Sequence, residues 1–186
     1  MSTASRLLQP QRTALLVVDL QQKLLPAIHE KERVLRSSLL LLRLAEALDL
    51  PVVLTTQYAK GLGATVPEVV ALRPDLVPLD KVSFSCFGDD GFRDRMGSLE
   101  GRDQLVVCGI ESHICVAQTV LGALADGRQV HVASDAVGSR TEANRQVGLQ
   151  RMAQAGACVS SAEAVIYELL GRSDVPAFKA MLPHLK

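Results

Sequence analysis

Short apolar runs alternate with longer amphipathic segments along most of this chain, and this alternation restricts the possible folds more than any other feature. The apolar runs have strand length and are rich in Val and Leu, without regular alternation with polar residues. Such runs are typical of strands that are covered on both faces. They occupy residues 13–18, 51–56, 104–108, 129–133 and 157–160.

Segments with helical spacing of apolar residues lie between these runs, at residues 32–48, about 114–126, 142–155 and 162–170. Gly127, Gly156 and Gly171 each follow one of them, and Thr141 precedes another, as expected for helix ends. Strands that alternate with helices predict a mostly parallel central sheet with helices on both faces. We therefore predict a Rossmann-like three-layer α/β/α fold, with residues 1–186 forming a single domain. Residues 57–101 read as surface loops around a short strand near Lys81.

The charge balance argues against a nucleic-acid or membrane partner. Lys and Arg total 20 and Asp and Glu total 20, so no net field attracts an anionic polymer. The apolar run "TALLVVDL" is too short to span a bilayer. The four cysteines show no paired spacing, which favours a reducing compartment. The segment 1–12 has two Arg and no acid, but it lacks the apolar core of a secretory signal, so we expect a cytoplasmic protein.

Three residues near the expected carboxyl ends of strands are candidates for chemistry, because ligands of open parallel sheets bind there. Asp19 follows the first apolar run, although an Asp there can also serve as a cap. Lys81 follows "PLD", and alone it would mean little. Cys115 opens the helical segment "CVAQTVLGALADG", where the helix dipole favours a thiolate. A buried Cys that only fills space is the common alternative, and we expect it to describe Cys108 and Cys158.

Three other features carry weaker hypotheses. His113 precedes Cys115 by two residues, so its ring is expected to project away from the sulfur and to lie at a rim or an interface. Cys86 follows Lys81 by five residues, but nothing places it at a helix start. The segment "GLGATV" lacks the third Gly of a dinucleotide loop, so a nucleotide cofactor is not expected.

Four separated motifs, "TALLVVDLQQKLLPAI", "TTQYAKGLGATVPEV", "DKVSFSCF" and "LVVCGIESHICVAQTVLGALADGRQVHVASDAVGSR", together resemble the isochorismatase-like cysteine hydrolase superfamily. The resemblance covers about residues 12–170 and implies an isochorismatase-type fold. It also implies a catalytic triad of Asp19, Lys81 and Cys115, and an oxyanion hole made by the backbone N–H groups of Glu111 and Cys115. In members of this family the peptide bond at the position of Ile110 and Glu111 is often cis.

Departures from two branches of the family narrow the expected reaction. Nicotinamidases carry Asp and His ligands to a metal after the second strand, but "TTQYAKGLGATVPEV" contains no His, so we expect no metal and no other cofactor. True isochorismatases often lack the nucleophilic Cys that this chain keeps. The resemblance therefore favours a subgroup of isochorismatase-domain hydrolases that cleaves a C–N bond of a small amide or a related carbonyl compound. On position alone, Gln57, Tyr58, Phe84 and Phe87 are expected to bind the substrate.

Two other classes of function stay open at this point. The chain can be a member of the same fold that has lost turnover and acts as a binding or scaffold protein. A redox module that pairs Cys115 with Cys86 or Cys108 ranks last, because the sequence has no CxxC motif. The family commonly forms oligomers, and the apolar segments "VLGALADG" and "VPAFKAMLPHLK" offer contact surface. A homo-oligomer with a small-molecule substrate is therefore the expectation.

Overall fold

The computed structural model describes residues 7–185, so the first half of the segment 1–12 lies outside the described residues. A six-stranded sheet forms the centre, with the strand order β3-β2-β1-β4-β5-β6 and parallel pairing between all neighbours. The strands are β1 (Thr13–Val18), β2 (Val52–Gln57), β3 (Leu79–Lys81), β4 (Gln104–Ile110), β5 (Gln129–Gly138) and β6 (Cys158–Ser160).

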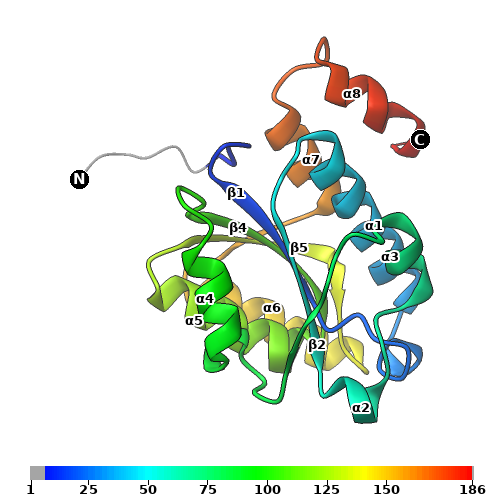
Figure 1. Cartoon of the computed structure of the whole chain (residues 1–186), viewed down its shortest axis with the longest axis vertical. Helices are drawn as coiled ribbons and strands as arrows, with labels where there is room; N and C mark the ends of the chain where they lie inside the picture. Colours follow the sequence, from blue (N-terminus) through cyan, green and yellow to red (C-terminus); the bar gives the residue numbers. More distant parts are fainter. Residues whose placement is uncertain (1–6, 186) are drawn as a thin grey trace.

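Helices cover both faces of this sheet, which confirms the predicted three-layer α/β/α fold (Figure 1). On one face lie α1 (Lys31–Ala47), α3 (Pro67–Leu72), α7 (Ala162–Leu170) and α8 (Pro176–Met181). On the other face lie α4 (Asp90–Gly97), α5 (Ala117–Ala125) and α6 (Glu142–Gln154). The short α2 (Ala59–Leu62) follows β2 at the edge of the sheet. No helix within residues 7–185 is long and apolar enough to cross a membrane.

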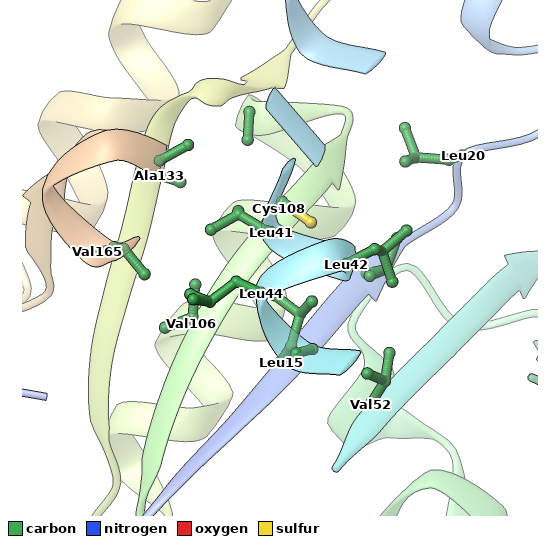
Figure 2. Close-up of a cluster of buried hydrophobic side chains, with 14 of the residues drawn as sticks. Leu15, Leu20, Leu41, Leu42, Leu44, Val52, Val106, Cys108, Ala133 and Val165 are labelled. Carbon is green, nitrogen blue, oxygen red and sulfur yellow. The ribbon is translucent and has the colours of Figure 1, made fainter. Parts of the chain in front are cut away.

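The strands divide their side chains between two apolar clusters, because successive residues of a strand point to opposite faces. Leu15 and Val17 of β1 pack toward α1, whose Leu41 and Leu42 lie in the same cluster (Figure 2). The alternate residues Leu16 and Val18 belong to the cluster under α4, α5 and α6. All residues of β1, β2 and β4 are buried, as the uninterrupted Val and Leu runs predicted.

The predicted helix ends are confirmed where the sequence offered a capping residue. Thr141 accepts a hydrogen bond from the backbone N–H of Asn144 through its side chain, and it begins α6. Gly127, Gly156 and Gly171 all have positive φ angles after α5, α6 and α7. In the two segments expected to offer contact surface, Val120 and Met181 are buried within the chain, whereas Leu182 is 41% exposed.

The prediction of surface loops over residues 57–101 is wrong in part, because α2, α3 and α4 lie within it. The α4 sequence "DGFRDRMG" contains two Gly and has little intrinsic helix propensity. Its Phe92 and Met96, four residues apart, are both buried under the sheet, and the Asp89 side chain caps the backbone N–H of Phe92. Burial of one helical face and a cap therefore decide the local structure.

The connections reverse direction at β1, which pairs with β2 on one side and with β4 on the other. The chain builds β2 and β3 outward from β1, and then returns to place β4, β5 and β6 on the opposite side. In open parallel sheets, a crevice forms beyond the carboxyl ends of the strands at such a reversal. Residues that follow β1 and β4 therefore face each other there.

Candidate active site

Asp19 and Lys81 form a buried ion pair at the carboxyl edge of the sheet. Asp19 follows β1 directly, and Lys81 is the last residue of β3. The Lys81 Nζ lies 2.8 Å from Asp19 Oδ2, and the two side chains are 1% and 0% exposed. Thr55 of β2 donates a hydrogen bond of 2.8 Å from its hydroxyl to the other carboxylate oxygen, Oδ1. Each carboxylate oxygen of Asp19 thus accepts from one donor, Thr55 of β2 or Lys81 of β3.

Gln57, the last residue of β2, gives Lys81 a second acceptor. The Gln57 Oε1 accepts a hydrogen bond of 2.9 Å from Lys81 Nζ, and the Gln57 Nε2 donates one of 2.8 Å to the carbonyl of Val82. The side chain of Gln21 bonds to both the N–H and the carbonyl of Gln57. The buried ammonium is therefore held between a carboxylate and an uncharged amide.

Close packing of two strand ends brings Cys115 to this pair. Gly109 in β4 has a φ of 118°, and a Cβ there would lie 2.0 Å from the carbonyl oxygen of Val18. Only Gly allows this approach of β4 to the residue that precedes Asp19. The Ile110–Glu111 peptide bond that follows is cis. The chain then forms a single π-helical turn, Ser112–Val116, that contains Cys115 and leads into α5.

The Cys115 thiol is held in its protonated form. Burial, which has the largest effect, and the negative charge of Asp19 together raise its pKa from 9.0 to about 12, although the positive charge of Lys81 opposes them. The predicted preference for a thiolate is therefore wrong for the resting protein, since burial and the carboxylate outweigh the cation.

Glu111 and His113 are both fixed by residues that follow β5. Glu111 Oε2 accepts hydrogen bonds from the backbone N–H of Arg140 at 3.2 Å and from its Nε at 3.1 Å. The His113 Nδ1 lies 3.0 Å from the hydroxyl of Ser139. This contact agrees with the expectation that His113 lies at a rim and does not serve Cys115.

The other residues expected in the site occupy different environments. Tyr58 and Phe84 are 51% and 55% exposed, and Val82 beside them is 79% exposed. Phe87 instead packs edge-on against Phe92, with 5.1 Å between the ring centroids, in the cluster under α4 and α5. Tyr58 and Phe84 thus lie on the loops beyond β2 and β3, whereas Phe87 packs against the core.

Cys86 lies within the same network but is enclosed. It is fully buried, and its Sγ lies 3.9 Å from the Thr55 hydroxyl. Burial raises the pKa of the Cys86 thiol to about 11, although Lys81 opposes this effect. Its thiol therefore contacts the residue that holds Asp19.

Within residues 7–185, one group of His and acidic side chains has the spacing of metal ligands: His29, Glu30 and Glu142, whose ligand atoms lie within 4.8 Å of one another. Glu30 pairs with Arg33 at 3.0 Å, and Glu142 pairs with Arg145 at 2.8 Å. Two guanidinium groups thus already neutralise the two acids. The group is separate from the Asp19 ion pair.

Sequence reasoning missed Thr55 and the role of Gln57 as a partner of Lys81. The run "VLTTQ" contains two Thr, and nothing in its composition tells which one faces Asp19. The face of Thr55 can be inferred once Val53 is known to pack under α4 and α5. Residues two apart in a strand point to the same face, so Thr55 lies on the face of Val53.

Comparisons with known proteins show the family to which this chain belongs. A family model described as Isochorismatase domain matches residues 13–164. The chain is also 37% identical over 182 residues to isochorismatase domain-containing protein 2A of Mus musculus, covering 95% of this chain and 84% of that protein. This chain therefore belongs to the isochorismatase family, whose hydrolase fold supports a hydrolytic role.

Solved structures agree with this assignment. The structure described as MAR1 ribonuclease from Caenorhabditis elegans has a TM-score of 0.87 and 36% identity, and the match covers 96% of this chain and 91% of that chain. The YcaC gene product of Escherichia coli, described as an octameric hydrolase of unknown specificity, has a TM-score of 0.91 and 28% identity. That match covers 98% of this chain and 92% of the other.

Proposed function

We propose that this protein is a cofactor-independent cysteine hydrolase that cleaves a C–N bond of a small amide or a related carbonyl compound. The observation that carries the proposal is the buried ion pair of Asp19 and Lys81 at the edge of the sheet, to which the turn after β4 brings Cys115 closely enough for both charges to act on its thiol. A nucleophile beside a base that is itself oriented by a third group is the arrangement required for covalent catalysis.

In the first half of the proposed reaction, Cys115 attacks the carbonyl carbon while its proton passes to Asp19. The raised pKa keeps Cys115 protonated at rest, whereas the thiolate is the nucleophile. A base that takes the proton during the attack is therefore needed. By the family resemblance, the backbone N–H groups of Glu111 and Cys115 stabilise the oxyanion. Asp19 then gives its proton to the leaving nitrogen, and the C–N bond breaks to leave a thioester on Cys115.

In the second half, Asp19 takes a proton from a water molecule that attacks the thioester. The C–S bond breaks, the proton on Asp19 returns to the sulfur, and the carboxylic acid product leaves. Lys81 stays charged throughout in this proposal. Its charge lowers the pKa of the thiol, so it favours the attacking form of Cys115.

The test is release of ammonia or amine from a panel of small amides, ureides and nicotinamide. We expect release by the wild type and none by Cys115→Ala, because the substitution removes the thiol that forms the thioester. Cys158→Ala is the matched control and should retain wild-type release, since Cys158 is exposed on β6, contrary to the expectation that it is buried. Equal release by Cys115→Ala and the wild type would contradict the proposal.

A binding or scaffold role in the same fold is the second candidate. It predicts that no compound of the panel is turned over while some still bind, which equilibrium dialysis measures. A single-stranded RNA oligonucleotide belongs in the panel, because the C. elegans relative is described as a ribonuclease. Cleavage of the RNA that persists in Cys115→Ala would assign a different activity.

We also propose that the chain forms a homo-oligomer, supported by the octameric description of the E. coli relative. Val82, Phe84 and Tyr58 are large apolar side chains exposed on neighbouring loops, as is common at protein contacts. Light scattering after size-exclusion chromatography should give a mass that is a multiple of the chain mass. A mass of 20.0 kDa would contradict this proposal.

A further inference from the structure

We propose that Gln57 is a positioning residue that acts through Lys81 and does not bind the substrate. This inference rests on the proposed function, because it assigns a role within the same site. The Gln57 side chain is 8% exposed, and both of its polar atoms are used inside the protein. Its oxygen accepts from Lys81 Nζ at 2.9 Å, and its nitrogen donates to the Val82 carbonyl at 2.8 Å.

The Val82 carbonyl fixes which way the Gln57 amide faces. A carbonyl oxygen can only accept, so it selects the NH₂ group of Gln57 and turns the amide oxygen toward Lys81. The reversed amide would bring two N–H groups against an ammonium and two oxygens against each other. The hydrogen bond from Gln57 to the Val82 carbonyl therefore ensures that the amide oxygen of Gln57, and not its NH₂ group, faces Lys81.

The backbone of Gln57 is fixed as firmly as its side chain. Gln21 is 0% exposed, and its Oε1 accepts from the Gln57 N–H at 2.7 Å. Its Nε2 donates to the Gln57 carbonyl at 3.1 Å and to the carbonyl of Gly63 at 2.7 Å. Three segments of the chain thus hold the residue that holds Lys81, which is the support that a precise site requires.

An uncharged acceptor suits this position because it satisfies Lys81 without competing with Asp19 for its charge. A buried ammonium that lacks hydrogen-bond partners is unstable and shifts or loses its proton. A second carboxylate would share the charge of Lys81 and add a negative charge near Cys115. Lys81 pairs with Asp19, and its charge lowers the pKa of the two neighbouring thiols, Cys115 and Cys86.

The test compares Gln57→Met, which keeps the size but removes the acceptor, with Gln57→Glu, which keeps an acceptor but adds a charge. For both we expect kcat to fall by about tenfold or more, with KM nearly unchanged across the amide panel. Alkylation of Cys115 by iodoacetamide at about pH 8 should also slow, because the thiolate fraction falls when Lys81 is displaced or shared. Gln150→Met, on the exposed surface of α6, is the control and should match the wild type.

A rise in KM that differs between substrates, with wild-type alkylation, would overturn the proposal and make Gln57 a substrate-binding residue. Wild-type values of kcat and alkylation in Gln57→Met would overturn it as well. The alkylation measurement needs no substrate, so it decides the role of Gln57 even if no amide is hydrolysed. If Gln57→Met does not fold, Gln57→Glu, whose carboxylate still accepts from Lys81, decides alone by the same criteria.

Discussion

Strand β1 has an ion pair at each end, and the two pairs differ in almost every physical respect. Before β1, Arg12 contacts Asp103, which precedes β4, through two hydrogen bonds of 2.8 and 2.5 Å, and the side chains are 30% and 53% exposed. After β1, Asp19 contacts Lys81 through one bond of 2.8 Å, and both side chains are almost completely buried. The exposed pair has the better hydrogen-bonding geometry.

The difference indicates that the buried pair is not explained by stability. An exposed ion pair is screened by solvent and contributes little, whereas a buried pair must first lose the hydration of both charges. A buried pair is often no more stabilising than apolar side chains of the same volume. The chain nevertheless keeps Lys81 and Asp19 at the edge where Cys115 lies, which is what a catalytic role requires.

The largest expected effect comes from removing one partner of each pair. Lys81→Met leaves the Asp19 carboxylate buried without its cation, so we expect the free energy of unfolding to fall by about 3–5 kcal/mol. Arg12→Met should leave it close to the wild-type value, because Asp103 remains hydrated. Urea denaturation measures both variants. Equal losses would show that burial does not distinguish the two pairs.

Removing both buried charges sharpens the same comparison. The double variant Asp19→Leu with Lys81→Met removes the uncompensated charge, so it should recover at least about 2 kcal/mol relative to Lys81→Met. It should remain inactive toward every amide that the wild type hydrolyses. A double variant as unstable as Lys81→Met would mean that packing, and not charge, dominates at this end of β1.

Thr55 and Thr56 offer a matched pair on opposite faces of β2. Thr55 donates to Asp19, whereas Thr56 donates to Asp80 at 2.9 Å outside the ion pair. Thr55→Val should lower the free energy of unfolding by about 1.5–3 kcal/mol, the range for a buried hydrogen bond to a charge. It should also lower kcat, and Thr56→Val should not. Equal kcat values in the two variants would contradict the role of Thr55.

The smallest expected effect is a pH dependence of the free energy of unfolding that arises from Cys115, at the carboxyl end of the sheet. The pKa of Cys115 is about 12 in the folded protein and 9.0 without burial, so the unfolded chain ionises first as the pH rises. The contribution of this thiol to the free energy of unfolding is therefore fully present below pH 9 and is lost as the pH rises from about 9 to 12. In Cys115→Ala the decline between pH 8 and 10 should be smaller by about 1 kcal/mol. Cys158→Ala should decline as the wild type does.

The strands, Asp19 and Cys115 could be singled out because each depends on a local pattern, whereas Lys81 was singled out only by the family resemblance. Uninterrupted Val and Leu runs gave β1 its observed bounds, and the rule for carboxyl ends singled out Asp19 and Cys115. The contact of Thr55 with Asp19 depends on the register between β1 and β2. The contact of Gln57 with Lys81 depends on the register between β2 and β3, which pairs these two residues. Both registers are set by packing between distant parts of the chain, so local patterns do not contain them.

The ionisation of Cys115 failed as a prediction for a related reason. The position of Cys115 near a helix start suggested a thiolate, but the dominant influences are burial and the charge of Asp19. The charge comes from the residue that follows β1, and the burial comes from the apolar cluster under α4, α5 and α6. Helix α4 was missed because it is stabilised by the burial of Phe92 and Met96, which depends on tertiary packing and not on the local sequence.

Alkylation of Cys115 in Asp19→Asn tests most directly whether Asp19 faces the thiol and keeps it protonated. The rate constant for iodoacetamide at about pH 8 is measured by peptide mass spectrometry, in protein with the circular dichroism of the wild type. We predict faster alkylation than in the wild type, because the charge that raises the pKa of the thiol is gone while Lys81 remains. Alkylation that is unchanged or slower would contradict the account.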